Sequence, residues 1–333
     1  MSRRCLLSLL ISVAVCLWAL GLVSAVAAQP PGKVHRVGFL SYFGCATAVA
    51  TEGAFRKELR GLGYVEGQNL VIECRDAPGR VDRLSELAAD LVQRKVDVLV
   101  AEATPSSLAA KSATTTTPIV MVAVADPVRK GLIASFARPG GNVTGVSGAP
   151  TLEVYGKVLE LLKEVAPHVS RVAVLTDRTN PGQVLMDDAV NAIGRALKIQ
   201  LRYINVRGAG DVENALVETL NWRAEALFLY PLPVETAEVH RIATFALTKR
   251  LPAVTLWEGY AEEGLLMFYG TGMTDLYRRA AVYVDKILKG ATPADLPVEQ
   301  AMTFPIVINL KTAKALGVTI PPSVLVRADQ VIK

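Results

Sequence analysis

Three short segments of the sequence place a polar residue directly before a proline. They are Thr104-Pro105, Asp126-Pro127 and Asn180-Pro181. Polar residues cap the N-terminus of a helix and proline is favoured at the first helical position, so each segment predicts the start of a helix. The first turn of a helix has amides without intrahelical partners and a partial positive charge, which favour carboxylates and phosphates. The three segments therefore predict a binding site for a small polar or anionic molecule.

The residue types at each predicted helix start suggest a role. We expect Thr104, Ser106 and Ser107, at the first of them, to hold a ligand carboxylate. Asp126 is suited to a ligand ammonium group through a charge-assisted hydrogen bond. The alternative is that these polar residues only cap their helices, a contribution of about 1 kcal/mol for each cap. For Asn180 the cap is the favoured interpretation, and the residue is kept as a candidate ligand contact.

Aromatic residues make up only 6% of the sequence, and several of them stand at the ends of predicted strands. Tyr42 and Phe43 follow the first strand, Tyr230 ends a strand in the second half, and Trp257 follows another. Their rings are suited to stack on a flat or apolar group of a ligand. Ordinary packing inside the fold is the alternative for each ring. Glu258 is a candidate partner for a second basic group or a hydroxyl of the ligand, although a solvated loop charge is the favoured interpretation.

Strand-like and helix-like segments alternate along the chain. Residues 119–125 form an unbroken apolar run, which is typical of a strand buried on both faces of a parallel sheet. Asp126-Pro127 then predicts a helix that ends at Arg138. Ten strands are expected, at 33–41, 70–74, 96–101, 119–125, 142–147, 170–176, 199–206, 224–230, 252–256 and 264–269. With helices between them, they predict an α/β protein with two doubly wound parallel-sheet lobes.

The links between the two halves of the chain predict a hinge. Helix 153–165 leads from the first lobe into the second, and helix 276–288 with the strand-like residues 303–308 is expected to return to the first. Such crossings let two lobes rotate and close on a ligand at the carboxyl edges of their sheets. The expected organisation is a signal peptide at 1–28, lobe 1 at 29–148, lobe 2 at 149–275, and a return crossing and C-terminal segment, 276–333, that packs on lobe 1.

The N-terminus has the pattern of an export signal. Arg3 and Arg4 precede an apolar stretch at 5–23, and residues 24–28 offer small side chains for cleavage after Ala28. An uncleaved membrane anchor is the alternative, because the apolar stretch is long. The pattern predicts a periplasmic protein with its signal peptide removed.

Composition and cysteine content restrict the function further. In an oxidising compartment, Cys45 and Cys74 either form a disulfide or remain two separate thiols, since both lie near strands that are neighbours in a doubly wound sheet. The three histidines are spread along the chain, so neither a metal site nor a cofactor is expected. The formal charge of +5 is too weak and too scattered to predict a nucleic-acid partner.

Five segments carry a resemblance to a known family: TPIVMVAVADPV, ARPGGNVTGVS, LELLKEVAPHVSRVAVL, RRAAVYVDKILKGATPADLPVEQ and NLKTAKALGVTIPPSVLVRAD. They resemble periplasmic substrate-binding proteins of ABC transporters, in the family whose characterised members take tryptophan and tyrosine. The resemblance implies a type I bilobal fold, no catalysis, and delivery of a small solute to an ABC permease in the inner membrane. It also favours a ligand role for Asp126. One departure is Glu102-Ala103, which stands where relatives usually have a glycine before Thr-Pro.

Motifs of the common enzyme classes are absent from the sequence. No Gly-x-Gly-x-x-Gly follows the first strand, and there is no Gly-x-Ser-x-Gly and no Walker loop. Together with the resemblance, which implies the transport role, these observations lead us to expect a monomeric extracytoplasmic receptor of an ABC importer, which clamps an amino acid-like or carboxylate-bearing ligand with an apolar or aromatic part. The alternatives are an extracytoplasmic hydrolase or isomerase that uses the same cleft, and a periplasmic sensor domain.

Overall fold

The computed structural model describes residues 33–45, 49–148, 152–184, 187–301 and 303–333. The predicted signal peptide at 1–28 and its cleavage site lie outside the described residues. His35–Lys333 form one unit, and everything below concerns this unit. Within the described part of the chain, no helix combines the length and the apolar character needed to cross a membrane.

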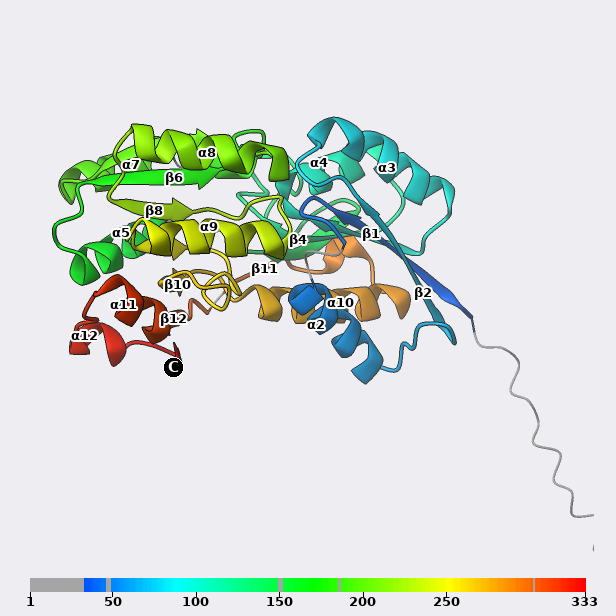
Figure 1. Cartoon of the computed structure of the whole chain (residues 1–333). Helices are drawn as coiled ribbons and strands as arrows, with labels where there is room; N and C mark the ends of the chain where they lie inside the picture. Colours follow the sequence, from blue (N-terminus) through cyan, green and yellow to red (C-terminus); the bar gives the residue numbers. More distant parts are fainter. Residues whose placement is uncertain (1–32, 46–48, 149–151, 185–186, 302) are drawn as a thin grey trace, which may run out of the picture. The chain divides into compact units, whose positions relative to one another are not determined.

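The first lobe is built on a six-stranded parallel sheet. Its central strand β4 (Ile119–Val124) is flanked by β3 (Val98–Glu102) and β5 (Val143–Ser147), and β1 (His35–Ser41), β2 (Leu70–Asp76) and β11 (Glu299–Gln300) complete the order β11-β5-β4-β3-β1-β2. Helices α2 (Val49–Gly61) and α10 (Met273–Leu288) pack on one face, and α3 (Val81–Gln93) and α4 (Ala103–Ala113) on the other (Figure 1). Because both faces are covered, the central strands are apolar throughout.

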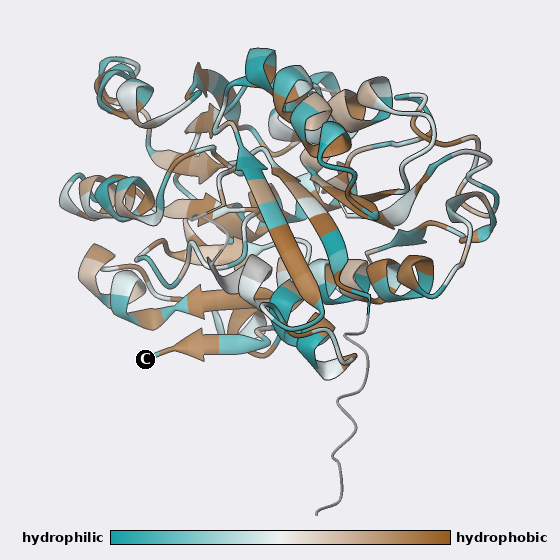
Figure 2. Ribbon diagram, turned by 90° about the vertical axis from the view of Figure 1, so that its right-hand side faces the viewer, coloured by the Kyte–Doolittle hydropathy of each residue, from teal (hydrophilic) through white to brown (hydrophobic). Residues whose placement is uncertain are grey.

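The second lobe repeats this plan and extends it. Strands β6 (Arg171–Thr176), β7 (Gln200–Asn205), β8 (Ala226–Leu229), β9 (Ala253–Thr255) and β10 (Met267–Tyr269) are joined by β12 (Ile306–Asn309) and β13 (Gln330–Ile332) in the order β13-β12-β10-β9-β8-β6-β7. Helices α8 (Ala209–Asn221) and α9 (Thr236–Thr248) cover one face, and α5 (Leu152–Val165), α7 (Asp187–Ala196), α11 (Leu310–Leu316) and α12 (Pro322–Leu325) share the core of the other. Figure 2 shows the apolar strands between helices whose outward residues are polar. The first five strands of both sheets follow the order 2-1-3-4-5, so the prediction of two doubly wound lobes is confirmed.

The C-terminal segment differs from the expected organisation. Residues 276–333 were expected to pack on the first lobe, and the part that does so consists of α10, the turn at 293–298 and β11. Strand β12 pairs antiparallel with β10, and β13 pairs with β12, so residues 306–333 belong to the second lobe. The strand-like residues near 306 do not show from sequence which sheet edge they join, because both edges accept an apolar strand.

The helix predicted after Asp126-Pro127 does not form. Residues 127–138 make turns instead. Asp126 and Gly131 both have positive φ, 43° and 67°, which is incompatible with a regular helix at these residues. Lys111 also donates from Nζ to the carbonyls of Gly131 and Leu132, at 2.7 and 2.8 Å, and fixes the turn from outside. Tertiary contacts have overridden a strong local signal.

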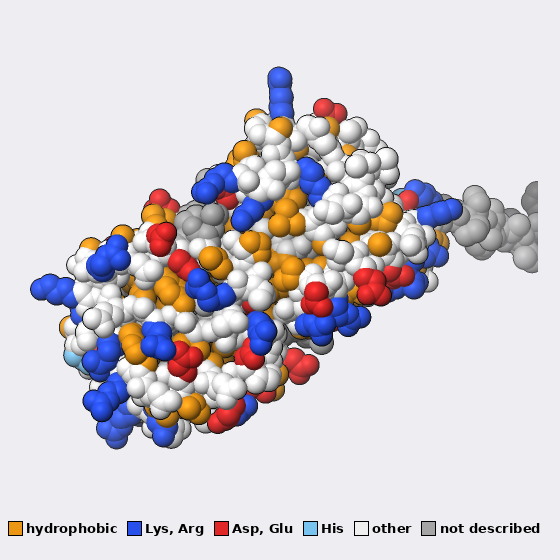
Figure 3. Space-filling view, turned by 90° about the horizontal axis from the view of Figure 1, so that it is seen from above, with side chains coloured by type: hydrophobic (Ala, Val, Ile, Leu, Met, Phe, Trp, Pro, Cys, Tyr) orange, Lys and Arg blue, Asp and Glu red, His pale blue; other side chains and the backbone are white. Residues whose placement is uncertain are grey.

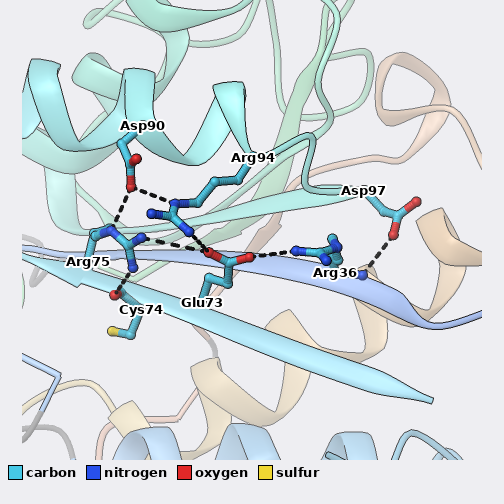
Figure 4. Close-up of polar contacts among 7 residues, drawn as sticks. All are labelled: Arg36, Glu73, Cys74, Arg75, Asp90, Arg94 and Asp97. Atoms are coloured by element: carbon cyan, nitrogen blue, oxygen red, sulfur yellow. Dashed lines mark hydrogen bonds and ion pairs between the residues drawn. The ribbon is translucent and has the colours of Figure 1, made fainter. Parts of the chain in front are cut away.

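An ion-pair network protects the exposed edge of the first sheet (Figure 4). Strand β2 is the edge strand, and its Glu73 lies 2.9 Å from Arg36 and 3.2 Å from Arg94. Asp90 on α3 lies 2.7 Å from Arg75 and 2.9 Å from Arg94. Charged side chains of this kind discourage pairing with another strand, and they also tie the edge strand to the helix above it.

Candidate functional site

A cavity lies between the two lobes, where the carboxyl ends of both sheets meet. It encloses about 520 Å³ of empty space, including space at its opening. The first lobe contributes Phe43, Ala103, Thr104, Ala123, Ala125 and Gly148. The second contributes Tyr155, Asn180, Gly182, Gln183, Pro231, Leu256 and Trp257, and the crossing between β10 and α10 adds Thr271 and Met273. In the view from above, hydrophobic side chains also gather where the lobes meet (Figure 3). This is where open α/β sheets bind their ligands.

Aromatic rings from both lobes form one wall of the cavity. The rings of Phe43 and Trp257 lie 5.0 Å apart between centroids, although one follows β1 and the other follows β9. Tyr155 on α5 lines the cavity as well, and behind it Tyr230 packs with its centroid 5.0 Å away. Tyr230 was expected to contact the ligand, but it is buried behind Tyr155 and does not line the cavity. Such a wall suits a flat or apolar group.

The N-terminus of α4 opens into the cavity. The helix begins at Ala103, directly after β3, and no side chain caps it. Thr104 lines the cavity, and its Oγ1 accepts a hydrogen bond from the Ala125 amide at 3.2 Å. Ser107 does not line it, because its hydroxyl donates to the carbonyls of Ala101 and Ala103 inside the fold. Of the three residues predicted at this helix start, the structure thus places Thr104 in the cavity wall.

Ser106 lies deeper in the same helix. It is fully buried, its hydroxyl has no hydrogen-bond partner, and it is not part of the cavity wall. The sequence pattern put Ser106 beside Thr104 because neighbouring residues in a first turn both lie near its amides. In the helix they point in different directions.

Asp126 also lies outside the cavity wall. Its Oδ1 accepts a hydrogen bond from the Arg129 amide at 3.1 Å, and its Oδ2 lies 3.5 Å from Nε of Arg129. The carboxylate therefore caps its own turn. The backbone explains this placement: strand β4 has a register shift between Val122 and Val124, and Ala123 takes a left-handed φ of 57°, which turns the end of the strand.

Two more candidates act as caps. Asn180 lines the cavity, and its Oδ1 accepts from the Gly182 amide at 2.9 Å, at the start of the short helix α6 (Pro181–Val184). Glu258 accepts from the Thr274 amide at 2.9 Å in the first turn of α10, and it is not part of the wall. The structure thus supports the cap interpretation for Asn180, which also lines the cavity, whereas Glu258 is neither part of the wall nor the solvated loop charge that was expected.

The loop after β1 is held in place by a disulfide and by hydrogen bonds to a buried carboxylate. Cys45 and Cys74 are joined by a disulfide, which ties this loop to β2. Glu102, fully buried, accepts hydrogen bonds from the Ser41 hydroxyl at 2.5 Å, the Phe43 amide at 3.3 Å and the Tyr277 hydroxyl. The residue that departs from the resemblance therefore anchors the loop that carries Phe43.

Tyr42 joins the lobes beside the cavity. Its hydroxyl donates to Oδ2 of Asp177 in the second lobe and lies 3.3 Å from Oγ1 of Thr179. Burial raises the pKa of Asp177, while the hydrogen bonds from Thr179 act in the opposite direction. Tyr42 is fully buried and is not part of the wall, so its role in the site is to hold the second lobe.

Several wall residues were missed by the sequence analysis. Thr271 lines the cavity and is 1% exposed, and its buried Oγ1 has no hydrogen-bond partner among the described residues. It follows β10, so a search for polar residues after every predicted strand would have found it. Gln183 also lines the cavity, but its side-chain amide is hydrogen-bonded within the second lobe, to Thr176, Asp177 and Pro231. No sequence signal marks Tyr155, because it lies within a helix.

Comparison with known proteins shows what this architecture is. The sequence model of the family described as ABC transporter substrate binding protein matches residues 44–332. The chain belongs to this family. Members of the family are solute-binding proteins and not enzymes, and the fold is that of type I periplasmic binding proteins.

Three related proteins are similar to the chain over most of its length. A tyrosine-binding protein from Clostridioides difficile is 28% identical over 262 residues, which are 79% of this chain and 75% of that protein. A Streptococcus pneumoniae ABC domain in complex with L-Trp is 25% identical with a TM-score of 0.79, covering 90% of this chain and all of that one. A ligand-free, open substrate-binding protein from Clostridium difficile has the same identity and coverage but a TM-score of 0.61. The chain is thus more similar in structure to the complex than to the open protein.

Proposed function

We propose that this protein is the extracytoplasmic solute receptor of an ABC importer, and that it encloses a small molecule with an aromatic part between its two lobes. The observation that carries the proposal is the inter-lobe cavity with rings from both sides, Phe43, Tyr155 and Trp257. An export signal at 1–28 and delivery to an inner-membrane permease are part of the proposal.

The contacts between the lobes support a closed arrangement. Tyr42 bonds Asp177 across the cleft, and a Cβ on Gly182 would lie 2.8 Å from Oγ1 of Thr104, so the lobes touch closely here. The higher similarity to the L-Trp complex than to the open relative agrees with this. Closure around a ligand buries it from water, which strengthens each hydrogen bond that the cavity offers.

The ligand class is supported by the wall and by the relatives. The N-terminus of α4 has no side-chain cap, and its first two residues, Ala103 and Thr104, line the cavity. A helix N-terminus favours a carboxylate because of its partial positive charge. The tyrosine-binding relative and the relative bound to L-Trp both favour an aromatic carboxylate. A hydrolase or isomerase in the same cleft has no comparable support.

A thermal-shift screen tests this proposal. The purified protein is heated with aromatic amino acids, aromatic acids and aliphatic amino acids, each added separately. A ligand at about a hundred times its Kd stabilises the folded state by about 2.7 kcal/mol. For a protein of this size, we expect Tm to rise by roughly 5 °C. Recovery of the bound compound unchanged is the expected result for a receptor. Consumption of the compound, or no shift with any aromatic compound, contradicts the proposal.

A further inference from the structure

The cavity wall carries no charge in the part of the chain that the structure describes. None of its lining residues is Asp, Glu, Lys, Arg or His. The internal segments outside the description, 46–48, 149–151, 185–186 and 302, contain only Ala, Thr, Pro, Leu and Met. The absence of charge therefore holds for the cavity wall formed by the described residues. A ligand here has to be recognised by neutral groups.

Three acidic residues are neighbours in sequence of residues that line the cavity, and each already accepts hydrogen bonds from other groups of the protein. Glu102 accepts hydrogen bonds from Ser41 and Tyr277, Asp126 caps the turn at Arg129, and Glu258 caps α10. Asp177 approaches from the second lobe, and there it accepts from Tyr42 and from the Thr179 amide at 2.9 Å. A ligand ammonium group needs an acceptor, and a buried ammonium without a paired anion is strongly disfavoured. The wall does not provide that anion.

What the wall does offer is mainly hydrogen-bond donors. Oγ1 of Thr104 already accepts from Ala125, so its own proton is left to donate. Oδ1 of Asn180 accepts from Gly182, which leaves the Asn180 amide NH₂ as a donor. At the start of α4, which no side chain caps, Ala103 and Thr104 line the cavity, and the buried hydroxyl of Thr271 has no partner among the described residues. Donors of this kind are suited to a carboxylate.

We propose that the ligand is an aromatic carboxylate without an α-ammonium group, of the 3-arylpropionate class. Its carboxylate is held at the N-terminus of α4 and by Thr271, and its ring packs against Phe43, Tyr155 and Trp257. The inference rests on the proposed receptor function and specifies its solute. The proposed ligand class differs from the zwitterionic amino acids, whose ammonium group needs a carboxylate of the receptor as its partner.

Calorimetric titration with matched compounds tests the inference. The pairs are 3-(4-hydroxyphenyl)propionate with L-tyrosine and indole-3-propionate with L-tryptophan, and tyramine and tryptamine report on the ammonium alone. We expect at least one propionate to bind about tenfold or more tightly than its amino acid, because the unpaired ammonium is costly to bury. The amines are expected not to bind. An amino acid that binds as tightly as its propionate, or more tightly, overturns the inference and leaves the receptor function standing. No binding by any of the six compounds overturns the inference, whereas the receptor function is refuted only if no aromatic compound of the thermal-shift screen binds.

Two substitutions test which wall groups are responsible. Thr271→Val removes the unpartnered hydroxyl at constant shape, and we expect it to weaken propionate binding about tenfold. Thr219→Val is its matched control, because Thr219 is fully buried in α8 and donates within the helix.

Ala123→Asp places a carboxylate in the wall, at a φ of 57° that Asp tolerates better than most residues. This variant is expected to shift preference toward the amino acid of each pair. An unchanged preference in a variant that still binds overturns the inference.

Discussion

The two lobes share one strand order but present different chemistry to the cavity. In the first lobe α4 begins at Ala103, directly after β3, so the helix N-terminus reaches the site. In the second lobe residues 230–235 separate β8 from α9, and the corresponding helix starts further along. Only the first lobe therefore brings the start of a long helix to the ligand at this position. The fold was duplicated, but the site is asymmetric.

Backbone strain follows the same division. In the first lobe Ala103, Ala123 and Asp126 have left-handed φ at the ends of β3 and β4, beside or within the cavity wall. The other non-glycine residues with positive φ that the structure describes follow helices away from the cavity, and they are Lys95 in the first lobe and Lys198, Arg223 and Arg250 in the second. Strained residues persist where surrounding structure and function require them. We infer that the first lobe supplies the helix N-terminus for polar recognition, while the second supplies most of the wall's shape, the contacts of closure and the Asn180 amide.

The largest effect is expected when the lobes are kept apart. A Cβ on Gly79 would lie 1.8 Å from the carbonyl oxygen of Arg207 in the second lobe, so Gly79→Ala cannot reach the closed arrangement. We expect ligand affinity to fall about a hundredfold, because the ligand binds the closed state preferentially. Calorimetry with the best compound of the thermal-shift screen measures this.

Gly67→Ala is the control for backbone strain. Gly67 has a similar positive φ, 80°, and a Cβ there would meet nothing within 4 Å. Both variants are expected to lose about 1 kcal/mol of folding stability, but only Gly79→Ala should lose affinity. Equal affinities would show that the Gly79–Arg207 contact does not belong to the ligand-bound state.

Removal of a ring from the wall is expected to have the next largest effect. Trp257 follows β9 and packs against Phe43 of the other lobe, so its ring contributes to both the wall and the contact between lobes. We expect Trp257→Ala to weaken binding by about 30-fold, as for a central aromatic contact at an interface. Trp222→Ala, in the second lobe outside the wall, should leave affinity unchanged. If both variants lose the same affinity for the ligand, the loss at Trp257 does not come from its place in the cavity wall.

Sequence patterns predicted the fold better than the site, for physical reasons. The apolar runs of β3 and β4 identify buried strands because burial on both faces requires them. The same local patterns placed Asp126 at a helix start, but a bulge in β4 and a contact from Lys111 decide that turn. Thr104 was found because it starts a helix right after a strand. Tyr155 was not, because its position depends on how α5 crosses between lobes.

A pair of substitutions at the first lobe separates caps from ligand contacts. Thr104→Val removes a donor at the start of α4 and is expected to weaken binding about tenfold, which corresponds to about 1.4 kcal/mol. Asp126→Ala removes a carboxylate that is engaged by Arg129, and we expect less than about threefold loss of affinity with a stability loss of about 1 kcal/mol. Calorimetry and thermal unfolding of both variants measure the two effects. A larger affinity loss at Asp126 than at Thr104 would restore the ammonium role predicted from sequence.

The smallest expected effect is a pH dependence of closure. Burial raises the pKa of Asp177 above its ordinary value of 3.8, and its partner Tyr42 lies on the other lobe. When the lobes open, water reaches Asp177 and its pKa falls back, so the closed state binds the proton more tightly. Closure is therefore favoured at low pH, and this advantage is lost as the pH rises from about 4 through the raised pKa. The ligand carboxyl also ionises at about pH 4 to 5, so the effect of Asp177 is the difference between the pH profiles of the wild type and Asp177→Asn, in which the wild type loses affinity a few-fold relative to the variant as the pH rises. Asp177→Asn should flatten the profile, whereas Asp187→Asn should leave it unchanged: burial also raises the pKa of Asp187, but its ion-pair partner Arg178 lies on the same lobe. If Asp177→Asn keeps the slope, the contact between Tyr42 and Asp177 does not link closure to protonation.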